Sequence, residues 1–81
     1  MKLGMTKALY NIKKTFPEMI ELHKTEIENH QRLIDNFKDS ANKTKNVEEK
    51  LVYLLESARN KEHQTSHKRM VTIYRFLSEN L

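Results

Sequence analysis

The sequence predicts an all-α fold, a small antiparallel three- or four-helix bundle that forms one domain over residues 1–81. The chain of 81 residues contains one glycine and one proline, so few positions interrupt a helix. No stretch alternates apolar and polar residues over five or more positions, which argues against strands. Apolar or half-apolar residues recur instead at alternating spacings of four and three, the period of a helix packed on another helix. This heptad seam consists of Phe16, Ile20, His23, Ile27, His30, Ile34 and Phe37.

The segment around the proline predicts a helix start. Thr15 and Glu18 have the spacing of a capping box, in which the Thr15 side chain caps the helix and Glu18 bonds back. Pro17 then falls in the first turn, where its missing N–H costs nothing. Because a proline inside a helix clashes with the carbonyl four residues earlier, we expect a break or sharp kink here. The expected helices cover about residues 6–14, 16–39, 47–62 and 66–80.

A polar loop over residues 39–46 separates the two halves of the chain. Asn46 is expected to cap the next helix, with Glu49 at its third position. Apolar residues at helical spacing then predict a face that packs inward. This face consists of Val47, Leu51, Leu54, Leu55 and Ala58.

The middle of the second half allows two interpretations. No residue from 59 to 69 is apolar, and a helical stripe resumes at Met70. A turn near residues 64–66 would make a fourth helix, whereas an uninterrupted helix from Val47 to about Asn80 would have a polar middle. Both alternatives stay open from sequence, because nothing in this segment breaks a helix outright.

Composition limits the class of protein. The chain has no cysteine, which excludes disulfides and thiolate zinc sites. No apolar run reaches membrane-spanning length, and the first residues lack the apolar core of a secretory signal. We therefore expect a cytoplasmic protein. The formal net charge of +4 and the pI of about 9.4 are compatible with an acidic partner.

Two histidines lie in the heptad seam. His23 and His30 are seven residues apart, so they share one helix face, and Glu26 lies near both. Such rings can make packing sensitive to pH or contribute to a metal site. We expect pH-sensitive stability at His23 and His30 and no metal site, because a third ligand within the seam is missing.

A second histidine pair has the H-x-x-x-H spacing. His63 and His67 would share one helix face, as in zinc-binding helices. The catalytic zinc motif requires glutamate directly after the first histidine, and Gln64 occupies that position. We therefore predict no metal ligand here either.

The sequence does not indicate an enzyme. It contains no nucleophile elbow, no glycine-rich phosphate loop and no Glu-x-x-His pattern of di-iron bundles. A core one seam deep would also enclose a pocket poorly. We expect no catalytic residue and no cofactor.

The favoured hypothesis is a non-enzymatic protein-binding module, a small regulator or inhibitor that docks on a larger protein through a helical face. Apolar residues beside the seam would anchor it, and basic residues would steer it toward an acidic surface. The predicted partner-binding residues are Val52, Tyr53, Arg59, Lys61, Lys68, Arg69, Val71 and Phe76.

Two alternatives use the same features. The basic segment 59–69 could bind nucleic acid phosphates, which is the second hypothesis. Residues 16–39 are rich in acid, so a structural homodimer could pair this segment with the basic segment of a second copy. In length, charge and helicity alone, the chain also resembles bacteriocin immunity proteins and phage-encoded host-takeover proteins.

Overall fold

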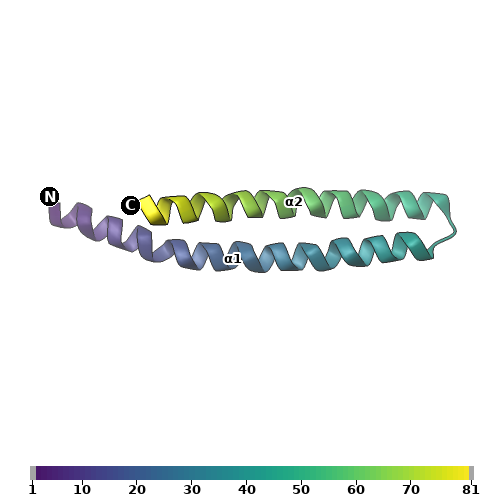
Figure 1. Cartoon of the computed structure of the whole chain (residues 1–81), viewed down its shortest axis with the longest axis horizontal. Coiled ribbons are helices and arrows are strands. Elements are labelled where there is room, and N and C mark those ends of the chain that lie inside the picture. Colours follow the sequence, from purple (N-terminus) through teal and green to yellow (C-terminus); the bar gives the residue numbers. More distant parts are fainter. Residues whose placement is uncertain (1, 81) are drawn as a thin grey trace.

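The computed structural model is a hairpin of two long antiparallel helices (Figure 1). It describes the backbone of residues 2–80 and the side chains of residues 14–80. Helix α1 spans Lys2–Lys43, helix α2 spans Val47–Asn80, and residues 44–46 connect them. The molecule measures 66 × 16 × 14 Å. The prediction of a three- or four-helix bundle is therefore wrong, because the chain forms two helices.

Pro17 lies inside α1 and does not end it. A proline there removes one backbone hydrogen bond but leaves the rest of the helix intact. Its neighbour Phe16 is 7% exposed, and the Phe16 ring lies 5.8 Å from the ring of Tyr74 on α2. This packing against α2 offsets the lost bond, so the expected break is absent. α1 starts at Lys2, ahead of the expected first helix 6–14, whose side chains lie outside the described ones except for Lys14.

The heptad seam of α1 faces α2, as predicted. Phe16 and Ile34 are buried, and the other five seam residues are half-buried. The same spacing continues for one more step to Ala41, which is 1% exposed. The alternating spacing thus identified the contact face of α1 over its described length.

The facing residues of α2 form a second, largely polar seam. They also follow spacings of four and three, which keeps them on one face of the helix. This polar seam consists of Tyr53, Ser57, Asn60, Gln64, His67, Val71 and Tyr74. As α1 advances by seven residues, its partner on α2 recedes by seven, which fixes an antiparallel register. The contacts that define it are Phe16–Tyr74, His23–His67, His30–Asn60 and Phe37–Tyr53.

The predicted inward face of the second half is wrong. Val47, Leu51, Leu54 and Leu55 are 72%, 56%, 43% and 66% exposed, and Ala58 is also exposed. This apolar stripe covers only the first third of α2. The polar seam extends along most of α2, so it can pair with the whole heptad seam and end in aromatic contacts. The longer polar seam is therefore buried against α1, and the more apolar but shorter face of α2 is left at the surface.

The connection and the middle of α2 settle two further predictions. Asn46 caps α2 as expected, because its Oδ1 accepts the backbone N–H of Glu48 at 2.9 Å and of Glu49 at 3.2 Å. The Glu49 carboxylate does not bond back to Asn46 but accepts the hydroxyl of Thr44 at 2.8 Å. Residues 59–69 remain helical, so the alternative with a turn is wrong and α2 is uninterrupted. The polar residues of this segment are tolerated because they lie in the polar seam or at the surface.

Candidate functional site

The most exposed apolar surface of α2 lies near the connection. Five large apolar residues fall within nine positions and are each at least 43% exposed. We call this surface the leucine face; it consists of Val47, Leu51, Val52, Leu54 and Leu55. A shallow hollow lined by Glu48, Glu49, Val52 and Tyr53 adjoins it. Contiguous apolar exposure of this kind marks an interaction surface more often than single exposed residues do.

The predicted apolar anchors separate into two groups. Val52 and Phe76 are exposed, at 55% and 63%. Tyr53 is half-buried against Phe37, with ring centroids 6.4 Å apart, and Val71 is 7% exposed between the helices. In this conformation, Val52 and Phe76 are accessible to a partner, whereas Tyr53 and Val71 hold the hairpin together.

The predicted basic residues are all at the surface. They are Arg59, Lys61, Lys68 and Arg69. Arg59 pairs with Glu56 at 3.2 Å on the same helix. Lys61 and Lys68 directly follow polar-seam residues Asn60 and His67, so they flank the seam on one edge.

Lys61, Lys68 and Arg75 each follow a polar-seam residue at intervals of seven, so they form a basic edge on α2. On α1 the positions that follow the seam residues have mixed charge, since Glu21, Glu28 and Asp35 alternate with Lys24 and Lys38. Lys24 also pairs with Glu21 at 3.7 Å, so the positive charge of this edge comes from α2.

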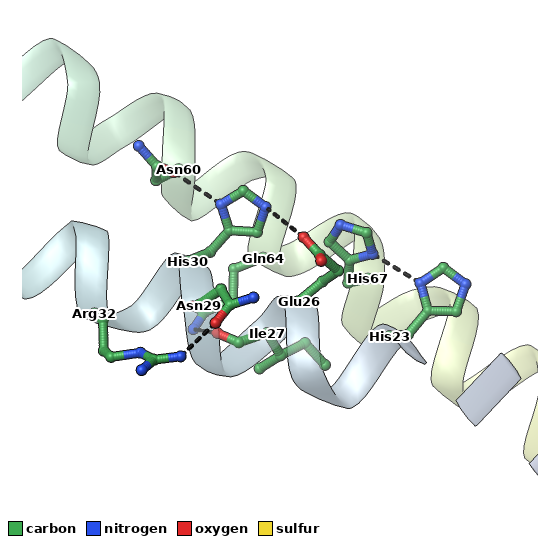
Figure 2. A network of polar contacts seen from close by, with 9 residues as sticks. All are labelled: His23, Glu26, Ile27, Asn29, His30, Arg32, Asn60, Gln64 and His67. Atoms are coloured by element: carbon green, nitrogen blue, oxygen red, sulfur yellow. Dashed lines mark hydrogen bonds and ion pairs between the residues drawn. The ribbon is translucent and has the colours of Figure 1, made fainter. Parts of the chain in front are cut away.

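All four histidines of the chain meet in the middle of the hairpin, and Figure 2 shows His23, His30 and His67 among them. The Nδ1 atoms of His23 and His67 are 2.7 Å apart, so one ring donates and the other accepts. The His30 ring is stacked on the rings of His63 and His67, each at a centroid distance of 5.5 Å. Glu26 lies one turn from His30, with its Oε2 atom 3.9 Å from His30 Nε2. We call these five residues the histidine cluster.

Asn60 fixes the orientation of the His30 ring. Its Nδ2 donates to the carbonyl of Glu56 at 2.8 Å, so its Oδ1 points to His30 Nδ1, also at 2.8 Å. Because the Asn60 oxygen can only accept, His30 Nδ1 must carry the proton. In the neutral ring, Nε2 is then left with a lone pair directed at the Glu26 carboxylate.

Burial lowers the pKa of the His67 imidazole below its ordinary value of 6.5, and the nearby His23 and His30 lower it further when charged. The Glu26 carboxylate acts in the opposite direction, and this weaker effect does not restore the usual pKa. The cluster therefore disfavours a proton on His67.

Gln64 occupies the layer next to the cluster and is 2% exposed. Its Nε2 donates to the Ile27 carbonyl at 3.2 Å and to Gln31 Oε1 at 2.8 Å. Its Oε1 is buried and has no hydrogen-bond partner among residues 14–80. Turning the amide over would point this oxygen at the Ile27 carbonyl, so the observed orientation is the better one.

Sequence reasoning found each histidine pair but missed that the two pairs meet. The sequence offered only Glu26 as a third ligand beside His23 and His30, whereas the structure brings His67 of α2 to Glu26 and His30. The signal was present in the spacing of the polar seam from Tyr53 to Tyr74. It was overlooked because the seam's central residues, Asn60 and Gln64, are polar.

Comparisons with known proteins give no relative for this hairpin: no family model, no curated protein and no solved structure matches the chain. Within the described residues, neither helix has a stretch long and apolar enough to cross a membrane.

Proposed function

We propose that this protein is a non-enzymatic protein-binding module, a small regulator that docks on a larger protein through the leucine face. The observation that carries the proposal is the inversion of polarity in α2. The helix buries Asn60 and Gln64 against α1 while it leaves Leu51 and Leu55 more than half exposed. Burying amides and exposing leucines is unfavourable for an isolated hairpin. A partner surface that covers the leucines would remove this unfavourable exposure.

The charges near the leucine face favour an acidic rim on the partner. Lys61 follows the face within two turns of helix and is exposed, whereas Arg59 is paired with Glu56. The acidic residues at the other end are partly engaged, since Glu49 accepts the Thr44 hydroxyl. The partner site is therefore an apolar patch whose far edge carries Asp or Glu opposite Lys61.

The test compares capture by the wild type with capture by Leu51→Gln/Leu55→Gln. The matched control is Leu22→Gln, because Leu22 on α1 is 61% exposed, close to the 66% of Leu55. Partners captured from lysate after nuclease treatment are identified by mass spectrometry, purified and titrated against all three proteins. We expect one protein whose affinity falls at least tenfold with the leucine-face variant and stays unchanged with the control.

Sedimentation of the purified protein alone completes the test. A dimer that is lost in Leu51→Gln/Leu55→Gln and kept in Leu22→Gln would reassign the face to a second copy and overturn docking on a larger protein. Equal loss with both variants would show nonspecific apolar adhesion and would also contradict the proposal.

The basic edge supports a second candidate, binding to nucleic acid. Lys61, Lys68 and Arg75 are exposed at intervals of seven residues on α2, so this helix presents a row of cations. This function predicts affinity for duplex DNA or RNA that falls steeply with salt. It also predicts that Lys61→Gln/Lys68→Gln weakens binding, whereas Leu51→Gln/Leu55→Gln does not. An affinity that does not change with salt would exclude this candidate.

A further inference from the structure

The histidine cluster brings two ligand pairs face to face. Glu26 and His30 are four residues apart on α1, and His63 and His67 are four residues apart on α2, so each pair shares a helix face. One oxygen of Glu26 and one ring nitrogen each of His30 and His67 lie within 4.8 Å of one another. These three residues come from both helices, and none is a predicted partner-binding residue.

We propose that Glu26, His30 and His67 form a binding site for a divalent transition-metal ion such as Zn²⁺, and that the ion clamps α1 to α2. Two imidazoles and one carboxylate are a ligand set that Zn²⁺ accepts, with a fourth position left for water or another side chain. His63 lies close enough to His30 to approach this fourth position.

The three ligand atoms must move closer together to bind one ion, which side-chain rotation can achieve. Zn–N and Zn–O bonds of about 2.0–2.2 Å in a tetrahedral site place neighbouring ligand atoms about 3.3 Å apart. Glu26 Oε2 and His30 Nε2 are already 3.9 Å apart. Glu26 is exposed and its side chain has rotatable bonds, so this carboxylate can approach His30 Nε2 without moving the helices. The His30 and His67 rings are stacked with 22° between their planes, so one ring must also turn to direct its nitrogen at the same ion.

The hydrogen bonds around the cluster prepare both rings as ligands. The Asn60 oxygen holds the proton of His30 on Nδ1, which leaves the Nε2 lone pair toward Glu26. A neutral ring nitrogen and a carboxylate oxygen both accept, so a cation between them is favourable. In Figure 2, the His30 ring has one nitrogen toward Glu26 and the other toward Asn60. The His67 ring has one nitrogen toward Glu26 and the other toward His23.

His23 has the same role for His67 that Asn60 has for His30. When His67 donates its Nδ1–H to His23 Nδ1, its Nε2 is unprotonated and can bind the ion. Outer hydrogen bonds of this kind fix the tautomer and the direction of metal-binding histidines.

The competing explanation is binding by the H-x-x-x-H pair on α2 alone. His63 is exposed and His67 is half-buried, so this pair could bind an ion without any ligand from α1. The two possibilities differ in whether Glu26 and His30 are required.

Calorimetric titration of the chelator-treated full chain with ZnCl₂ tests the proposal. We expect one ion per chain and an increase in melting temperature with Zn²⁺. Glu26→Gln and His30→Gln should each weaken binding at least tenfold, and Asn60→Ala by about 10–100-fold through the outer hydrogen bond. The matched control, Glu28→Gln, removes an exposed carboxylate two residues from Glu26 and should bind as the wild type does.

If the affinity for Zn²⁺ is unchanged in His30→Gln but lost in His63→Gln, the ion binds the His63 and His67 pair of α2 and the proposal is overturned. The absence of binding by the wild type would do the same. NMR of the ring nitrogens in the unaltered chain avoids any folding defect of the variants. Zn²⁺ should shift Nε2 of both His30 and His67, and an unshifted His30 ring would refute the cross-helix site. The leucine face plays no part in this experiment, so its outcome is independent of the proposed function.

Discussion

Replacing Gln64 with leucine should stabilise the hairpin, although the wild-type side chain makes two hydrogen bonds. Gln64 is 2% exposed, and its Oε1 has no partner among the described side chains and backbone. Leucine has nearly the same volume and lies at a seam position where an apolar side chain is normal. The adjacent carbonyl of Ile27 keeps its intrahelical bond after the change.

The expected gain follows from three contributions. Removing a buried acceptor without a partner relieves about 1–3 kcal/mol. Burying a leucine side chain contributes about 1.5–3 kcal/mol. The two lost hydrogen bonds, to Ile27 and Gln31, cost about 0.5–1.5 kcal/mol each. The midpoints of these ranges combine to a net stabilisation of about 2 kcal/mol.

Urea denaturation followed by circular dichroism measures this difference as a shift of the midpoint at constant slope. For a chain of this size, the melting temperature should rise by about 4–8 °C for each kcal/mol. Thr65→Leu adds the same side chain at the neighbouring exposed position and should change stability by less than about 0.5 kcal/mol. Destabilisation by Gln64→Leu would refute the argument and show that the amide is needed in the seam.

Three further predictions test the register, the cap and the histidine cluster. Ile34→Ala should lower the free energy of unfolding by about 2–4 kcal/mol, because Ile34 is 3% exposed. Leu55→Ala, at a position that is 66% exposed, should lower it by less than about 0.5 kcal/mol. Urea denaturation measures both changes. Asn46→Ala should cost about 1 kcal/mol in the same assay, since it removes the acceptor for two backbone N–H groups of α2. In the presence of a chelator, thermal melts should show that stability falls as the pH drops below 6.5, because the unfolded chain then binds a proton that the half-buried His67 ring resists. The fall should level off below the lowered pKa of His67 in the folded chain.

Each of these predictions has an outcome that contradicts it. A larger loss with Leu55→Ala than with Ile34→Ala would mean that α2 turns its leucines toward α1. An unchanged stability of Asn46→Ala would show that the α2 N-terminus is capped in another way. A flat stability profile from pH 5 to 8, or one unchanged in His67→Gln, would show that this ring is solvated.

Much of α1 could be read from its residues. The alternating spacing from Phe16 to Phe37 predicted the contact face, and it did so despite the two histidines in it. The prediction failed at Pro17, because a local capping pattern competes with the packing of Phe16 on Tyr74, and only the second is a long-range interaction. Local signals do not include the energy of a contact with a residue 58 positions away in the chain.

The sequence by itself determined that the chain is helical, where α2 begins and which face of α1 is covered, because capping and periodicity are local properties. Only the tertiary structure decided which face of α2 is buried. That choice depends on how far a face of α2 can pair with the heptad seam of α1. The polar seam from Tyr53 to Tyr74 pairs with it along most of the hairpin, whereas the leucines cover only the first third of α2. The same pairing brings Glu26 and His30 to His67 and leaves the leucine face outside. Both candidate sites therefore arise from the register between the helices, which neither helix contains alone.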